Sequence, residues 1–93
     1  MTDFTTLHNY YEKQVVDMVL DLAPNYPLLK KDHLPDVACV ALNRLPPRYI
    51  RHEVDFSFYL TEHERLEIDN AIGEAVSYAF NFVQARTALR ARK

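Results

Sequence analysis

A pair of adjacent prolines, Pro46-Pro47, constrains the fold of this chain more than any other feature of its sequence. Each proline fixes its own φ angle and removes a backbone donor, and Pro46 also disfavours the helical conformation at the residue before it. An apolar segment with helical spacing therefore has to end at this point. That segment contains Val37, Ala38, Val40, Ala41 and Leu42. The sequence thus predicts a stiff corner at the end of a helix.

Polar and aromatic side chains surround the predicted corner. In chain order they are Asn43, Arg44, Arg48, Tyr49 and Arg51. Guanidinium groups bind phosphates through two hydrogen bonds or stack on flat rings, and tyrosine rings stack on bases. We therefore predict a binding surface for a planar or anionic ligand. Two alternatives remain: Asn43 caps the carboxyl end of the helix, and the arginines pair with acids on the surface.

The composition favours helices. A single glycine among 93 residues argues against tight β-turns and against glycine-rich phosphate loops. A chain of this length forms one domain whose own core is marginal. We predict a mostly α fold over residues 1–93, built as a three-helix unit with a basic carboxyl-terminal tail over about residues 86–93.

Capping signals and apolar stripes place the three helices. Thr5 or Thr6 is expected to cap the first helix, which runs to about residue 22. Asp32 is expected to cap the second, with Pro35 in its first turn. A capping box over residues 61–64 starts the third, which runs to about residue 88. The apolar stripe of the first helix is wider than one contact requires, so this helix either lies centrally in the bundle or packs across a dimer. Gly73 is expected to let another helix approach closely.

The segment between the second and third helices shows a different pattern. Val54, Phe56, Phe58 and Leu60 alternate with polar or tyrosine residues over residues 53–60. A period of two is typical of an extended chain. We predict an irregular arm over about residues 49–60 that buries its phenylalanines, with strand pairing as the alternative.

Several classes of function find no support in the sequence. The formal net charge of −2 gives no general attraction to nucleic acid, and the basic tail leaves DNA binding as a lesser alternative. The single cysteine, Cys39, excludes an internal disulfide. No apolar run approaches about 20 residues and the first residues do not resemble a signal peptide, so we predict a cytoplasmic protein that does not span a membrane. No nucleophile–base pair is apparent, and no enzyme is expected.

The segment ALNRLPPRY, preceded by Asp36-Val37 and followed by a long amphipathic helix, resembles the late competence ComFB family of bacteria. Asn9, Glu12 and Val15 fit the opening helix of that family, and the resemblance extends over residues 8–83. It implies a small helical homodimer without catalytic activity that binds a cyclic di-nucleotide, either cyclic di-GMP or cyclic di-AMP. A two-fold dimer would present the predicted binding residues twice to a ligand that is itself two-fold.

The chain departs from the family at one motif. Typical members carry a Cys-x-Cys-x-x-Cys zinc motif, and the corresponding positions here are Leu28, Lys30 and His33. Leucine has no ligand atom and zinc needs several ligands, so no zinc and no other cofactor is expected. The alternative to a receptor is a ligand-free dimeric adaptor, in which the proline corner and the arm are purely structural.

Overall fold

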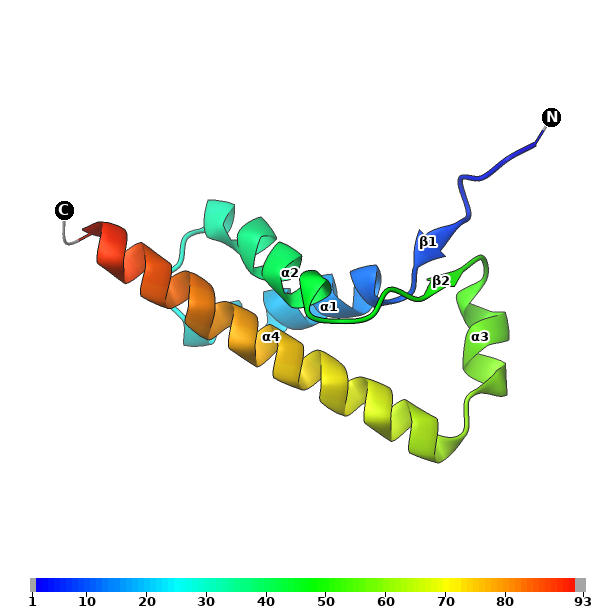
Figure 1. Ribbon diagram of the computed structural model, residues 1–93. Coiled ribbons are helices and arrows are strands. Elements are labelled where there is room, and N and C mark those ends of the chain that lie inside the picture. The colour runs from blue at the N-terminus through cyan, green and yellow to red at the C-terminus, as the bar shows by residue number, and fades with distance from the viewer. Residues whose placement is uncertain (1, 92–93) are drawn as a thin grey trace.

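The computed structural model describes residues 2–91, and it confirms the predicted mostly helical fold. The helices are α1 (Tyr11–Leu22), α2 (Leu34–Asn43), α3 (Glu53–Tyr59) and α4 (Glu62–Ala91), with single 3-10 turns η1 (Ala23–Asn25) and η2 (Lys31–His33). Two short strands, β1 (His8–Asn9) and β2 (Tyr49–Ile50), pair antiparallel. Figure 1 shows α1 and α2 beside the long α4, with α3 near the amino-terminal end of α4. The predicted tail continues α4 as far as residue 91, and its last two residues lie outside the described part.

The core forms where α1, α2 and the middle of α4 meet. Its buried members are Tyr11, Val15, Val19, Val37, Ala41, Leu45, Ile68, Ile72, Ala75, Val76, Ala79, Phe80 and Val83. The Phe80 ring is fully buried and stacks on the Tyr26 ring at 4.2 Å between centres. Leu7 precedes α1, lies outside this core and is 50% exposed. No helix among residues 2–91 has the length and apolar character that crossing a membrane requires.

The prediction that Thr5 or Thr6 caps the first helix is wrong, because α1 begins at Tyr11. The residues just before α1 instead pair with the segment after the proline corner. The Asn9 side-chain oxygen accepts hydrogen bonds from the backbone N–H of Tyr11 at 3.2 Å and of Arg48 at 3.0 Å. The backbone N–H of Tyr10 donates to the Arg48 carbonyl at 2.7 Å. The chain leaving the corner thereby finds partners for its polar backbone groups, and this draws residues 8–9 out of the helix.

The prediction of an extended arm over about residues 49–60 is wrong for residues 53–59, which form helix α3. At the start of that segment, Tyr49–Ile50 forms a paired strand, which was the alternative. Phe56 packs against the core, with its ring centre 4.5 Å from that of Tyr10, whereas Phe58 is 80% exposed. Alternation predicted both phenylalanines on one face, but a helical turn separates them by about 200° because each residue advances by 100°. The guanidinium of Arg65 donates to the Ser57 carbonyl at 2.6 Å and satisfies a group at the end of this helix.

The other helix starts follow local signals more closely. Pro35 lies in the first turn of α2 as predicted, but the helix is preceded by the 3-10 turn η2, so Asp32 does not cap it. The capping box at the start of α4 is confirmed: the Glu64 N–H donates to the Thr61 hydroxyl at 3.1 Å, and the Thr61 N–H donates to the Glu64 carboxylate at 3.3 Å. The close helix contact predicted at Gly73 is absent within residues 2–91, because a Cβ placed there would meet no atom within 4 Å.

Candidate functional site

The predicted binding residues lie in two groups on either side of the proline corner. Arg44 follows the last residue of α2, and its guanidinium lies 3.8 Å from the centre of the Tyr78 ring on α4. The Asn43 side-chain amide donates to the Cys39 sulfur at 3.8 Å. Arg48, Tyr49 and Arg51 come after the corner, and the Arg48 guanidinium lies 4.6 Å from the centre of the Phe56 ring on α3. The structure thus brings Arg44 and Arg48 to rings on different helices.

A hollow of about 430 Å³, here called the α3 pocket, lies between β2 and α3. It is lined by Ile50, Arg51, His52, Asp55, Phe56 and Tyr59. The Arg48 guanidinium covers the ring of one lining residue, so a second cation stands beside the pocket. The hollow is open to solvent along one side, so a ligand in it would stay partly exposed.

The cations at the α3 pocket keep hydrogen-bond donors available for a ligand. The ion pairs found among residues 2–91 do not involve an arginine, so the alternative of surface ion pairing is not seen for Arg48 or Arg51. The Arg51 side chain makes one long hydrogen bond, from Nε to the Thr6 hydroxyl at 3.5 Å. The Tyr49 and Tyr59 side chains are 66% and 79% exposed. Guanidinium donors and open aromatic rings together suit a ligand that has both phosphates and flat bases.

The backbone that carries these cations is held in place on both sides. The ladder between β1 and β2 pairs His8 with Ile50 and Asn9 with Tyr49. Arg48 is tied through its N–H to the Asn9 side chain and through its carbonyl to the Tyr10 N–H. Side chains on a fixed backbone lose less conformational entropy when a ligand binds.

Of the residues that line the α3 pocket, the sequence analysis had found Arg51 and missed Ile50 and four residues on or next to α3. His52, Asp55, Phe56 and Tyr59 were assigned to an extended arm, on which they would not share one face. Their spacing of i, i+3, i+4 and i+7 places them on the same side of a helix. That spacing was the available signal, and the alternation of apolar residues concealed it.

A smaller polar hollow of about 120 Å³ lies behind α3, between Tyr10 and the start of α4. Burial raises the pKa of the Tyr10 hydroxyl, and the nearby carboxylates of Glu53 and Asp69 raise this pKa further. The hydroxyl therefore stays neutral well into the alkaline range.

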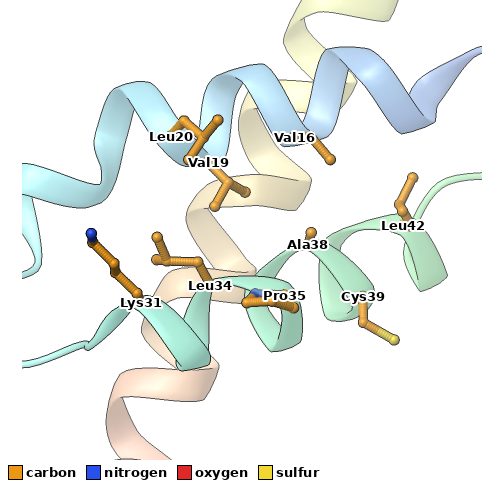
Figure 2. A pocket seen from close by; sticks show the side chains of 9 residues that line it. All are labelled: Val16, Val19, Leu20, Lys31, Leu34, Pro35, Ala38, Cys39 and Leu42. Atoms are coloured by element: carbon orange, nitrogen blue, oxygen red, sulfur yellow. The ribbon is translucent and has the colours of Figure 1, made fainter.

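A third hollow, here called the α1–α2 groove, has a volume of about 670 Å³. Figure 2 shows its side chains, with Lys31 near one end and Leu42 near the other, and with α4 crossing behind the two helices. It is lined by Val16, Val19, Leu20, Lys31, Leu34, Pro35, Ala38, Cys39 and Leu42. The first helix was predicted to carry a wider apolar stripe than one contact requires. Two side chains of this helix that do not enter the core, Val16 and Leu20, line the groove and are 45% and 59% exposed.

The positions that correspond to the zinc motif do not fit a metal ion. Leu28 is 66% exposed and carries no ligand atom. The Nδ1 atom of His33 accepts a hydrogen bond from the Lys30 backbone N–H at 2.9 Å. Within residues 2–91, no three His, Cys, Asp or Glu side chains gather closely enough to hold a metal ion. The residues present therefore do not support the zinc site of typical family members.

Comparison with known proteins identifies a family for most of the chain. The family model described as late competence development protein ComFB matches residues 8–87, which include the proline corner, the α3 pocket and most of α4. No curated protein and no solved structure matches the chain.

Proposed function

The chain belongs to the late competence development protein ComFB family, and from this premise we propose that it is a cytoplasmic receptor for a cyclic di-nucleotide. Cyclic di-GMP is the first candidate ligand and cyclic di-AMP is the second. The protein acts as a homodimer and senses the nucleotide without catalysing a reaction. The α3 pocket is the observation that carries this proposal, because it combines the Arg51 guanidinium, which takes part in no ion pair among residues 2–91, with the exposed Tyr59 ring.

Each part of the ligand has a matching group at the α3 pocket. Arg48 and Arg51 supply the donors for phosphate oxygens. Tyr59 in the pocket lining, and the exposed Tyr49 that precedes the lining residue Ile50, offer faces on which a purine can stack. Stacking on an aromatic ring is worth about 1–3 kcal/mol per base. Asn43 and Arg44 take a peripheral part, because neither lines the α3 pocket and the Arg44 guanidinium lies on the Tyr78 ring of α4.

Titration calorimetry with cyclic di-GMP and with cyclic di-AMP tests the proposal. We expect saturable heat with at least one nucleotide, together with a ligand-dependent rise in the melting temperature. Arg48→Glu is expected to abolish binding while the circular dichroism spectrum and the state of association stay unchanged. Arg90→Glu is the matched control, because it makes the same charge change at an exposed position on the last turns of α4. Absence of heat and of a thermal shift with both nucleotides, well above micromolar concentration, would reject the receptor.

The α1–α2 groove favours a second candidate function, that of a dimeric adaptor without a nucleotide ligand. The side chains that line this groove are apolar except for Lys31, and an apolar lining suits contact with another protein. The adaptor predicts no heat with either nucleotide, for the wild type as for Arg48→Glu, whereas the receptor predicts heat that Arg48→Glu removes. The same set of measurements therefore separates the two functions.

A further inference from the structure

The α1–α2 groove leaves apolar side chains in solvent on the face of α1 and α2 that α4 does not cover. Tyr11, Val15 and Val37 use the other face of these helices for the core. On the open face, Leu20 and Val16 keep about half of their surface accessible. Among residues 2–91, Lys31 is the only charged side chain that lines the groove. The accessible surface of the groove is therefore almost entirely apolar.

We propose that this groove packs face to face against the same groove of a second copy of the chain. The two-fold axis crosses α1 and α2, so that each of these helices lies against its own counterpart running in the opposite direction. The four helices then enclose the exposed apolar side chains of both copies. This inference rests on the homodimer of the proposed function and identifies the surface that forms it.

The distribution of charge along the groove favours a second copy as the occupant. Lys31 lies at one end, close to Leu34 and on the side of Leu20 (Figure 2). Glu12, Val16 and Leu20 are spaced four residues apart and therefore lie on the same side of α1. The eight residues between Glu12 and Leu20 correspond to about 12 Å along the helix axis. Glu12 therefore marks the opposite end of the groove from Lys31.

An antiparallel copy matches these charges to each other twice. Neither Glu12 nor Lys31 takes part in an ion pair among residues 2–91, whereas the neighbouring Asp17 is already paired with Lys13 at 3.4 Å. In the two-fold arrangement, Lys31 of each copy comes to the end of the groove where Glu12 of the other copy stands. A surface that is apolar in the middle and oppositely charged at its two ends is complementary to itself, as an interface between identical subunits must be.

The first test replaces an exposed apolar side chain in the groove and a matched one elsewhere. Leu20→Lys places a charge in the proposed interface, and Leu66→Lys places the same charge on α4; the native side chains are 59% and 60% exposed. Analytical ultracentrifugation over a range of protein concentrations is the measurement. We expect Leu20→Lys to raise the dimer dissociation constant about a hundredfold, because two leucines leave the apolar interface together. Leu66→Lys should leave that constant unchanged.

The second test exchanges the charges between two variants. Lys31→Glu alone and Glu12→Lys alone each place like charges opposite one another in a dimer, so each is expected to weaken self-association. Mixed in equal amounts, they should form a heterodimer in which both contacts again join opposite charges. The gain on mixing should shrink as salt concentration rises. A lack of any gain on mixing at low salt would overturn the antiparallel arrangement.

The outcomes separate this inference from the proposed function. A wild-type dimer that neither Leu20→Lys nor the charge changes affect would overturn the groove as the interface and leave the homodimer intact. Dissociation by Leu66→Lys in place of Leu20→Lys would move the interface to α4. A wild-type monomer at all concentrations would reject the homodimer itself, while calorimetry would still decide nucleotide binding. A monomer that releases a bound apolar molecule on solvent extraction would also overturn the inference.

Discussion

Gly73 offers the clearest quantitative test of the packing around α4. The residue lies inside a 30-residue helix, where glycine is less favourable than alanine by about 0.5–1 kcal/mol. An added Cβ would meet no atom within 4 Å, so no steric penalty offsets this gain. Gly73→Ala is therefore expected to raise the free energy of unfolding by about 0.5–1 kcal/mol.

In a domain of this size, 1 kcal/mol corresponds to about 4–8 °C in melting temperature, so the expected rise is roughly 2–8 °C. Urea unfolding should show a higher midpoint with an unchanged slope, because the surface exposed on unfolding does not change. Both variants must be compared at one protein concentration, since association raises the apparent stability. Ser77→Ala, at an exposed position one turn further along α4, is the matched control and should give a smaller gain.

A lower melting temperature or a weakened dimer in Gly73→Ala would refute this reasoning. Such a result would mean that another chain approaches α4 closely at this position, as the sequence analysis expected of a neighbouring helix. It would also contradict the α1–α2 groove as the dimer surface, because the interface would then include α4.

Two further predictions concern the junction between the amino-terminal segment and the proline corner. Asn9→Ala removes the acceptor of two backbone N–H groups and should lower the free energy of unfolding by about 1–3 kcal/mol and weaken nucleotide binding; an unchanged urea midpoint would contradict this. Burial raises the pKa of Tyr10 in the folded protein, so the unfolded chain loses this proton at a lower pH. The contribution of Tyr10 to the free energy of unfolding is therefore complete below about pH 10 and is lost as the pH rises through the folded pKa. Tyr10→Phe should remove that part of the loss in urea midpoints measured from roughly pH 8 to pH 11, and parallel curves for the two proteins would show the reasoning wrong.

The parts of the fold that could be predicted are those fixed by neighbouring residues. The Thr61–Glu64 capping box depends on a spacing of three residues and is present as expected. Pro35 starts α2 and Pro46-Pro47 ends its apolar run, since proline acts on its own backbone and on that of the preceding residue. The core stripes of α1 and α4 follow from helical periodicity alone.

The parts that could not be predicted depend on contacts between distant segments. Asn9 and Arg48 are 39 residues apart, and their hydrogen bond takes the place of the helix start expected at Thr5 or Thr6. Helix α3 was hidden because a segment of seven residues fits both a period of two and a helical turn. For the candidate site, Arg48, Tyr49 and Arg51 were found from their chemistry, while Asp55 and Tyr59 required knowledge that the segment is helical.

The α1–α2 groove and the α3 pocket are connected through the ends of the same two helices. Strand β1 leads directly into α1, and the proline corner that bears Arg48 leads out of α2. The Asn9 side chain joins these two ends, since it accepts from the first N–H of α1 and from the N–H of Arg48. A second copy that fixes α1 and α2 against each other would therefore also fix the backbone that carries the cations of the pocket. Coupling between binding equilibria is reciprocal. If dimer formation raises the affinity for the nucleotide by some factor, the bound nucleotide would therefore lower the dimer dissociation constant by that same factor.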